Sequence, residues 1–267
     1  MAKKNTIWFE FGIQVSDKRC INARAKVWSK LFGQYKQQYE MLPHYAIEIF
    51  WLTQISNNMI KIKCDNNVFQ RIYICFDSLR KGFLPGCRPF ISLDGCFLKG
   101  SFRGQLLAVM GRDGNNQMYP VAWAAVESEQ TNSWPWFLQL LADDLGTVDG
   151  RDFTLMSNEQ KGLLNAIQNV WPGAQQRSCA RHVYANIRTL HGAVEIRKCF
   201  WLIAKSSTTR RYEKSIKQMK KFSILAEDLV KRHPERWCTA FFGLLLVLVA
   251  LEIVLTTIWL RFSMHIF

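Results

Sequence analysis

The chain has 267 residues, of which 49% are hydrophobic, so it can build a sizeable core, and wholesale disorder is excluded. A total of 35 Lys and Arg against 21 Asp and Glu gives a net charge of +14, which favours polyanionic partners such as nucleic acid or an anionic membrane surface. The eight cysteines are scattered without a CxxC pair, which argues against a zinc ribbon or a disulfide framework and favours a reducing compartment. Residues 1–18 lack the apolar core of a secretory signal, so we expect no secretion from this end.

The first part of the chain changes from a helical to an extended pattern. Apolar residues spaced three and four apart over residues 25–52 predict one or two amphipathic helices, interrupted at Pro43. Residues 60–76 alternate between apolar and polar and predict two short strands around a turn at Asp65. We therefore expect residues 1–85 to form a helical N-terminal region with a strand pair.

A regular series of strands and helices follows. Three strands joined by short loops predict an antiparallel meander, at residues 89–98, 105–111 and 119–126. Residues 133–145 predict a helix with Ser133 as its N-cap and with its stop at Gly146.

The second half of the series alternates strands with helices. Its expected elements are a strand at 153–156, a helix capped by Ser157 and Gln160, a strand at 174–179 and a helix at 181–190. This order is that of a ribonuclease-H-like α/β domain, a mixed sheet with flanking helices. We expect this core over residues 86–192 and a basic helical extension over residues 193–238.

Asp94 closes the first strand of this core, in the stretch ISLDGCFLKG. A carboxylate at the end of a buried strand costs free energy unless it binds a metal, a donor or a proton, so it indicates a site; the alternative is a turn Asp before Gly95. In the ribonuclease-H-like order the first and fourth strands are neighbours, which places Asp94 opposite Asn158. Two carboxylates there would hold two divalent metals for attack on a phosphodiester.

Several long motifs resemble the plant Mutator-like element (MULE) transposases and proteins derived from them. They are QRIYICFDSLRKGFLPGCRPFISLDGCFLKG, NSWPWFLQLLADDLG, FTLMSNEQKGLLNAI and CARHVYANIR, and the resemblance covers roughly residues 12–242. It implies a DDE-type core that cuts DNA at element ends and joins the freed 3′-hydroxyl to target DNA. It also implies Mg²⁺ or Mn²⁺ as cofactor, DNA as partner and the nucleus as location.

Only one of the family's three acids has a counterpart here. Asp94 matches the first catalytic Asp, a metal ligand, whereas the SDxQKGL motif reads SNEQKGL and puts Asn158 at the second. A neutral amide lacks the charge that a two-metal site needs. The third acid, a Glu beyond the CxxH motif, is missing, as if the match were truncated. We therefore expect no DNA cleavage and weak, non-specific DNA binding; an active nuclease that uses Glu159 or Glu252 instead remains an alternative.

Cys179 and His182 match the family's CxxH motif. They could supply two of the four ligands of a zinc ion, or they could be a buried Cys and a hydrogen-bonded His that pack near the site. Lys99, Arg103 and Arg181 are expected to form the phosphate-facing side of the fold, with ordinary solvated charge as the alternative for each.

The tail, residues 239–267, is apolar. Ala240 to Leu260 carries one charge, Glu252, and is long enough to cross a bilayer core of ~30 Å, so it predicts a transmembrane helix. A buried helix and a degenerate sequence with no selected role are the alternatives. The second expected function is therefore a tail-anchored, membrane-associated protein that keeps the transposase domain as a folded module.

Overall fold

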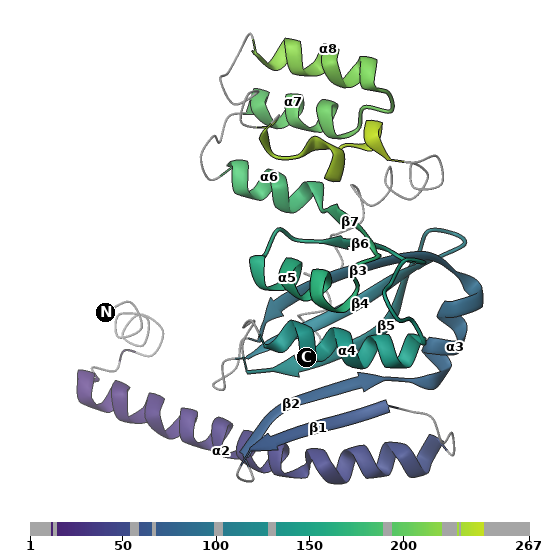
Figure 1. The fold of residues 1–267 in the computed structure, drawn as a ribbon. Helices are drawn as coiled ribbons and strands as arrows, with labels where there is room; N and C mark the ends of the chain where they lie inside the picture. The colour runs from purple at the N-terminus through teal and green to yellow at the C-terminus, as the bar shows by residue number, and fades with distance from the viewer. Residues whose placement is uncertain are drawn as a thin grey trace.

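The computed structural model describes residues 12, 15–53, 59–65, 68–98, 104–127, 132–188, 194–220, 229 and 231–242. They contain a mixed seven-stranded sheet in the order β1-β2-β5-β4-β3-β6-β7, with helices around it (Figure 1). The strands are β1 (Met59–Asp65), β2 (Val68–Cys75), β3 (Cys87–Phe97), β4 (Gln105–Asp113), β5 (Met118–Val126), β6 (Thr154–Ser157) and β7 (Gln175–Ser178). The predicted mixed α/β class is confirmed.

The helices are α2 (Asp17–Thr53), α3 (Asp77–Gly86), α4 (Ser133–Leu145), α5 (Lys161–Val170), α6 (Ala180–Arg188), α7 (Val194–Ala204) and α8 (Thr209–Lys220). Two short 3₁₀ turns follow, η1 (Pro234–Arg236) and η2 (Thr239–Phe241). In Figure 1, α2 runs beside β1 and β2, α4 and α5 lie together over one face of the sheet, and α6 to α8 extend beyond the β7 edge.

The predicted meander and strand pair are both present, and they belong to one sheet. β3, β4 and β5 are consecutive antiparallel strands, and β1 pairs with β2. β2 then pairs antiparallel with β5, with Tyr73 opposite Ala124. The N-terminal strand pair therefore extends the sheet of the core.

β6 and β7 enter the sheet in parallel on the other side of β3, because α4 and α5 carry the chain back to the same end each time. The register pairs Phe90 with Thr154, Ser92 with Met156 and Leu93 with Ser157. This confirms that the first and fourth strands of the core are neighbours.

The main core lies between the sheet and the face of α4 and α5. Since side chains alternate along a strand, Ile91 and Leu93 of β3 and Leu155 of β6 point to this side, where they are fully buried. α4 contributes Phe137, Leu138 and Leu141 to the same cluster. The alternate residues of β3 and β6, Asp94 among them, belong to the opposite face.

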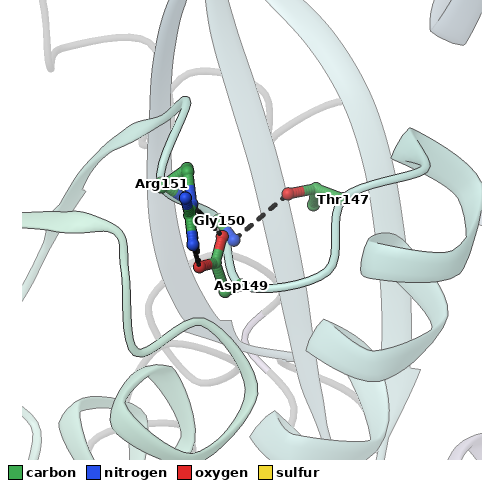
Figure 2. A network of polar contacts seen from close by, with 4 residues as sticks. All are labelled: Thr147, Asp149, Gly150 and Arg151. Carbon is green, nitrogen blue, oxygen red and sulfur yellow. Dashed lines mark hydrogen bonds and ion pairs between the residues drawn. The ribbon is translucent and has the colours of Figure 1, made fainter.

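The loop from α4 to β6 fixes where β6 begins (Figure 2). The N–H of Gly150 donates to Oγ1 of Thr147 at 3.1 Å, and Arg151 forms an ion pair with Asp149 at 2.7 Å. Gly150 has φ +72°, and a Cβ there would lie 2.7 Å from the side chain of Trp171. Only glycine fits both the left-handed backbone and this close approach.

α6 to α8, η1 and η2 pack around a second core, and we call this unit the helical module. Its fully buried residues include Phe200 of α7 and Trp237, whose rings stack with centroids 5.4 Å apart. Arg177 of β7 links the module to the sheet, since its Nη1 donates to the carbonyl of Glu235 at 2.5 Å and its guanidinium lies 4.6 Å from the ring centre of Phe242.

The expected interruption at Pro43 is wrong, because α2 continues through it. The pyrrolidine removes one backbone N–H, and one turn before it Tyr39 packs against Phe69, with ring centres 5.3 Å apart. Proline therefore costs one helical hydrogen bond here and does not end the helix.

The expected apolar C-terminal helix is not seen in the part of the chain that the structure describes. Ala240 and Phe241 belong to η2 and pack against the core of the helical module, and Phe242 is extended. The start of the predicted span is therefore wrong, and residues 243–260 lie outside the described residues.

Candidate functional site

Asp94 and Asn158 come together at one edge of the β3–β6 pair. Each follows directly after a residue of the pair formed by Leu93 and Ser157. By the alternation of side chains along a strand, Asp94 lies on the same sheet face as Phe90, whose buried side chain packs with Met156 of β6. The site thus lies on the face opposite the main core.

Asn158 is committed to the start of α5. Its Oδ1 accepts the backbone N–H of Gln160 at 3.2 Å, and Gln160 Oε1 in turn accepts the N–H of Leu163 at 2.6 Å. The N-cap of α5 is Gln160. The expected capping box of Ser157 with Gln160 is therefore wrong, since Ser157 remains in β6 and the helix begins later.

The CxxH motif approaches the same edge. The backbone N–H of Cys179 donates to the carbonyl of Ser157 at 2.8 Å, which fixes the start of α6 beside the end of β6. Cys179 is buried with Phe90, and Nε2 of His182 lies 4.0 Å from Oδ1 of Asp94. The structure thus places a buried thiol and an imidazole beside the acid, and within the described residues Nδ1 of His182 is buried without a hydrogen-bond partner. Both alternatives for the motif stay predictions.

Asp94 and His182 influence each other's protonation. Burial raises the pKa of Asp94 above its usual value, while the His182 charge and the N–H of Gly95, 2.9 Å away, partly offset this rise. The pKa of His182 is raised, mainly by its interaction with the Cys179 side chain and further by Asp94, against the opposing effect of its partial burial. A protonated His182 therefore partly replaces the counter-charge that a cation would give Asp94.

The residues present do not fit a two-metal centre. Such a centre needs several anionic oxygens, whereas this edge supplies the carboxylate of Asp94 and an amide oxygen of Asn158 that already accepts a hydrogen bond. In the described part of the chain, no three His, Cys, Asp or Glu side chains are grouped so that they could hold a metal ion. Among the described residues, no third side chain of this kind joins Cys179 and His182 to complete a zinc site.

The predicted phosphate-binding residues are only partly described. Lys99 and Arg103 lie outside the described residues and stay predictions. Arg181 is half-buried on α6, next in sequence to His182. Arg177 is also a cation near this region, but its guanidinium is taken up by the carbonyl of Glu235 and the ring of Phe242.

The sequence reasoning missed two features of the site. One is that Gln160 alone occupies the N-cap position of α5 and accepts the N–H of Leu163. The other is the contact of His182 with Asp94, which follows only once β6 and β7 are parallel neighbours. The three-residue spacing of CxxH shows that its side chains share a helix face, but not what that face contacts.

None of the helices in the described residues combines the length and the apolar character that crossing a membrane requires. The membrane alternative therefore has no support from this part of the chain.

Comparison with known sequences agrees with the site. No curated protein matches the chain at a significant level. One protein-family model matches residues 90–186. The match begins at Phe90, within the strand that carries Asp94, and ends at Asn186 in α6, so it includes Asn158 and the CxxH motif. It covers less than half of the chain. Residues 90–186 form a MULE transposase domain.

Proposed function

We propose that this chain is a transposase-derived protein with a ribonuclease-H-like core that binds DNA without cutting or joining it. The observation that carries the proposal is the presence of Asn158, beside Asp94, at the matching ends of β3 and β6. A transposase of this type needs charge at both positions to hold two metals. The domain match supports DNA as the partner, and by the same resemblance we propose the nucleus as the location.

The chemistry and the contacts of Asn158 support the loss of metal binding. Its side chain is a neutral amide, which lacks the charge that a two-metal site needs at this position. Asn158 is in turn engaged with the start of α5.

The net charge of +14 supports the DNA-binding half of the proposal. Lys and Arg that neutralise phosphates release counterions from DNA, so the affinity should fall steeply with salt and depend little on sequence. DNA contact through charge alone would not require an intact metal centre.

The test uses the purified full chain and two labelled DNA duplexes of unrelated sequence. Fluorescence anisotropy should show similar affinities for both and a large loss of affinity between about 50 and 200 mM salt. The same protein should give no cleaved or joined products with Mg²⁺ or Mn²⁺. Metal-dependent products that disappear in Asp94→Asn, which keeps the oxygen facing the Gly95 N–H, would overturn the proposal.

A further inference from the structure

We infer that the exposed face of α8 is a docking surface for the phosphate backbone of a DNA duplex; the inference rests on the proposed function and locates it at a site away from Asp94. α8 lies at the far end of the helical module, beyond the β7 edge of the sheet (Figure 1). The proposed DNA contact is therefore separate from the end of the β3–β6 pair that carries Asp94 and Asn158.

α8 has one buried and one charged face. Its buried residues are Tyr212, Ile216 and Met219, spaced four and three apart, and Tyr212 packs edge-on against Phe241 with ring centres 5.0 Å apart. Apart from Ser215, which is half-buried, the remaining positions are exposed and include five cations against one acid: Arg210, Arg211, Lys214, Lys217 and Lys220, with Glu213. The module holds the helix by its apolar side and presents the cations to solvent.

These cations are available to a partner. Within the described residues no ion pair engages any of them, and the polar contact of Arg211 is a hydrogen bond to Oγ of Ser207 at 3.3 Å. Arg210, Lys214 and Lys217 are spaced by four and three residues and so form a stripe along the helix. Like charges this close repel one another, and a polyanion would relieve that repulsion.

The dimensions fit a duplex. The cations from Arg210 to Lys220 extend over roughly 15 Å of helix at 1.5 Å per residue. A duplex carries about nine phosphate charges over that length, at one per 1.7 Å. Several of these phosphates can thus lie along the stripe at once.

The start of α8 adds neutral donors and a favourable dipole. Ser207, Thr208 and Thr209 are exposed there, and the N–H of Arg211 donates to Oγ1 of Thr208 at 3.3 Å. The N-terminal end of a helix carries partial positive charge, which adds to that of Arg210 and Arg211. Hydroxyls and backbone dipoles at this end favour phosphate oxygens over aromatic or apolar ligands.

The chemistry of the face distinguishes DNA from other anionic partners. No large hydrophobic side chain is exposed on α8 itself, in contrast to α2, where Ile21 and Trp28 are exposed. A membrane-binding helix would need such side chains to enter the lipid, and a protein partner would bury them. The α8 face offers charge without apolar area.

The experiment compares two matched double variants of the full chain. Lys214→Gln/Lys217→Gln removes two exposed cations of α8, and Lys26→Gln/Lys30→Gln removes two exposed cations of α2, about one turn apart in each case. Glutamine has nearly the helix propensity of lysine, so both proteins should fold as the wild type does. Circular dichroism and urea midpoints check this.

For the α8 variant we expect Kd for a DNA duplex to rise roughly tenfold at about 0.1 M salt, and the slope of log K against log salt to become shallower by up to about 2. The α2 variant should bind as the wild type does. Equal effects of both variants would show diffuse charge and overturn the assignment to α8, while DNA binding itself would stand.

Absence of DNA binding by the wild type would overturn both this inference and the proposed function. A third arm uses vesicles of phosphatidylserine and phosphatidylcholine. If the α8 variant lost vesicle binding and kept its affinity for DNA, the surface would belong to anionic lipid instead.

Discussion

Replacing Gly150 by Ala should destabilise the protein by roughly 1–5 kcal/mol, from two separable causes. The residue has φ +72°, and an L side chain in that region costs about 1–2 kcal/mol. The new Cβ would also lie 2.7 Å from Cβ and Cγ of Trp171. Trp171 is fully buried and stacks on Phe153 with ring centres 6.0 Å apart, so it cannot move without disturbing the core.

Overpacking of this kind costs about 1–3 kcal/mol. Alanine also lowers the conformational entropy of the unfolded chain, which offsets about 0.4–1 kcal/mol of the lost stability. The sum gives the stated range, and local changes should spread to β6, which begins just after this loop (Figure 2).

Gly146 offers a matched control. It ends α4 with φ +67°, yet a Cβ there would meet nothing within 4 Å. Gly146→Ala should therefore lose about 1 kcal/mol, the backbone cost alone. Urea unfolding followed by circular dichroism gives both values. Equal losses in the two variants would refute the role assigned to the contact with Trp171.

Three further predictions concern polar groups. Burial raises the pKa of Asp144, whose Oδ2 also accepts the hydroxyl of Tyr73 at 2.6 Å. The folded state therefore holds the carboxyl proton of Asp144 more tightly than the unfolded state does. The free energy of unfolding thus falls as pH rises through the raised pKa. Asp144→Asn should gain stability over the wild type as pH rises above the usual carboxyl range, and a difference in unfolding free energy that does not change with pH would contradict this. Arg177→Ala should cost about 1–3 kcal/mol and lower hydrogen-exchange protection in residues 231–242 before that of the sheet; uniform loss of protection would argue against a local link. Asn158→Ala should lose about 0.5–1.5 kcal/mol of unfolding free energy with the bond to the Gln160 N–H, whereas Asn158→Asp should be close to the wild type, and thermal unfolding that ranks them in reverse would contradict the cap.

The central elements of the fold could be predicted because local and tertiary preferences agree there. The bounds expected for α4, residues 133–145, are those observed, and Gly146 ends the helix in the left-handed conformation. The expected N-cap is wrong, because Ser133 is already helical and the N-cap position is that of Asn132. The meander strands alternate clearly and are separated by turn residues. Adjacency of Asp94 and Asn158 then followed from the order of the elements.

α3 could not be predicted, because its sequence opposes a helix. It contains Gly82 and Pro85, and it forms through contacts that are remote in sequence: Phe83 is fully buried and stacks on Phe153 with ring centres 6.1 Å apart. The one local signal is Asp77, which pairs with Arg80 and Lys81 at helical spacing.

The hydrogen bond from the Gln160 N–H to Asn158 has a consequence for how such a domain can change over time. An aspartate and an asparagine both present the oxygen that this turn requires, so folding selects weakly between them. A substitution that removes a metal ligand can therefore leave the stability of the domain almost unchanged. Position 158 is one where a single substitution can remove catalysis. The protein that remains is still stable and basic, so it stays available for selection in another role.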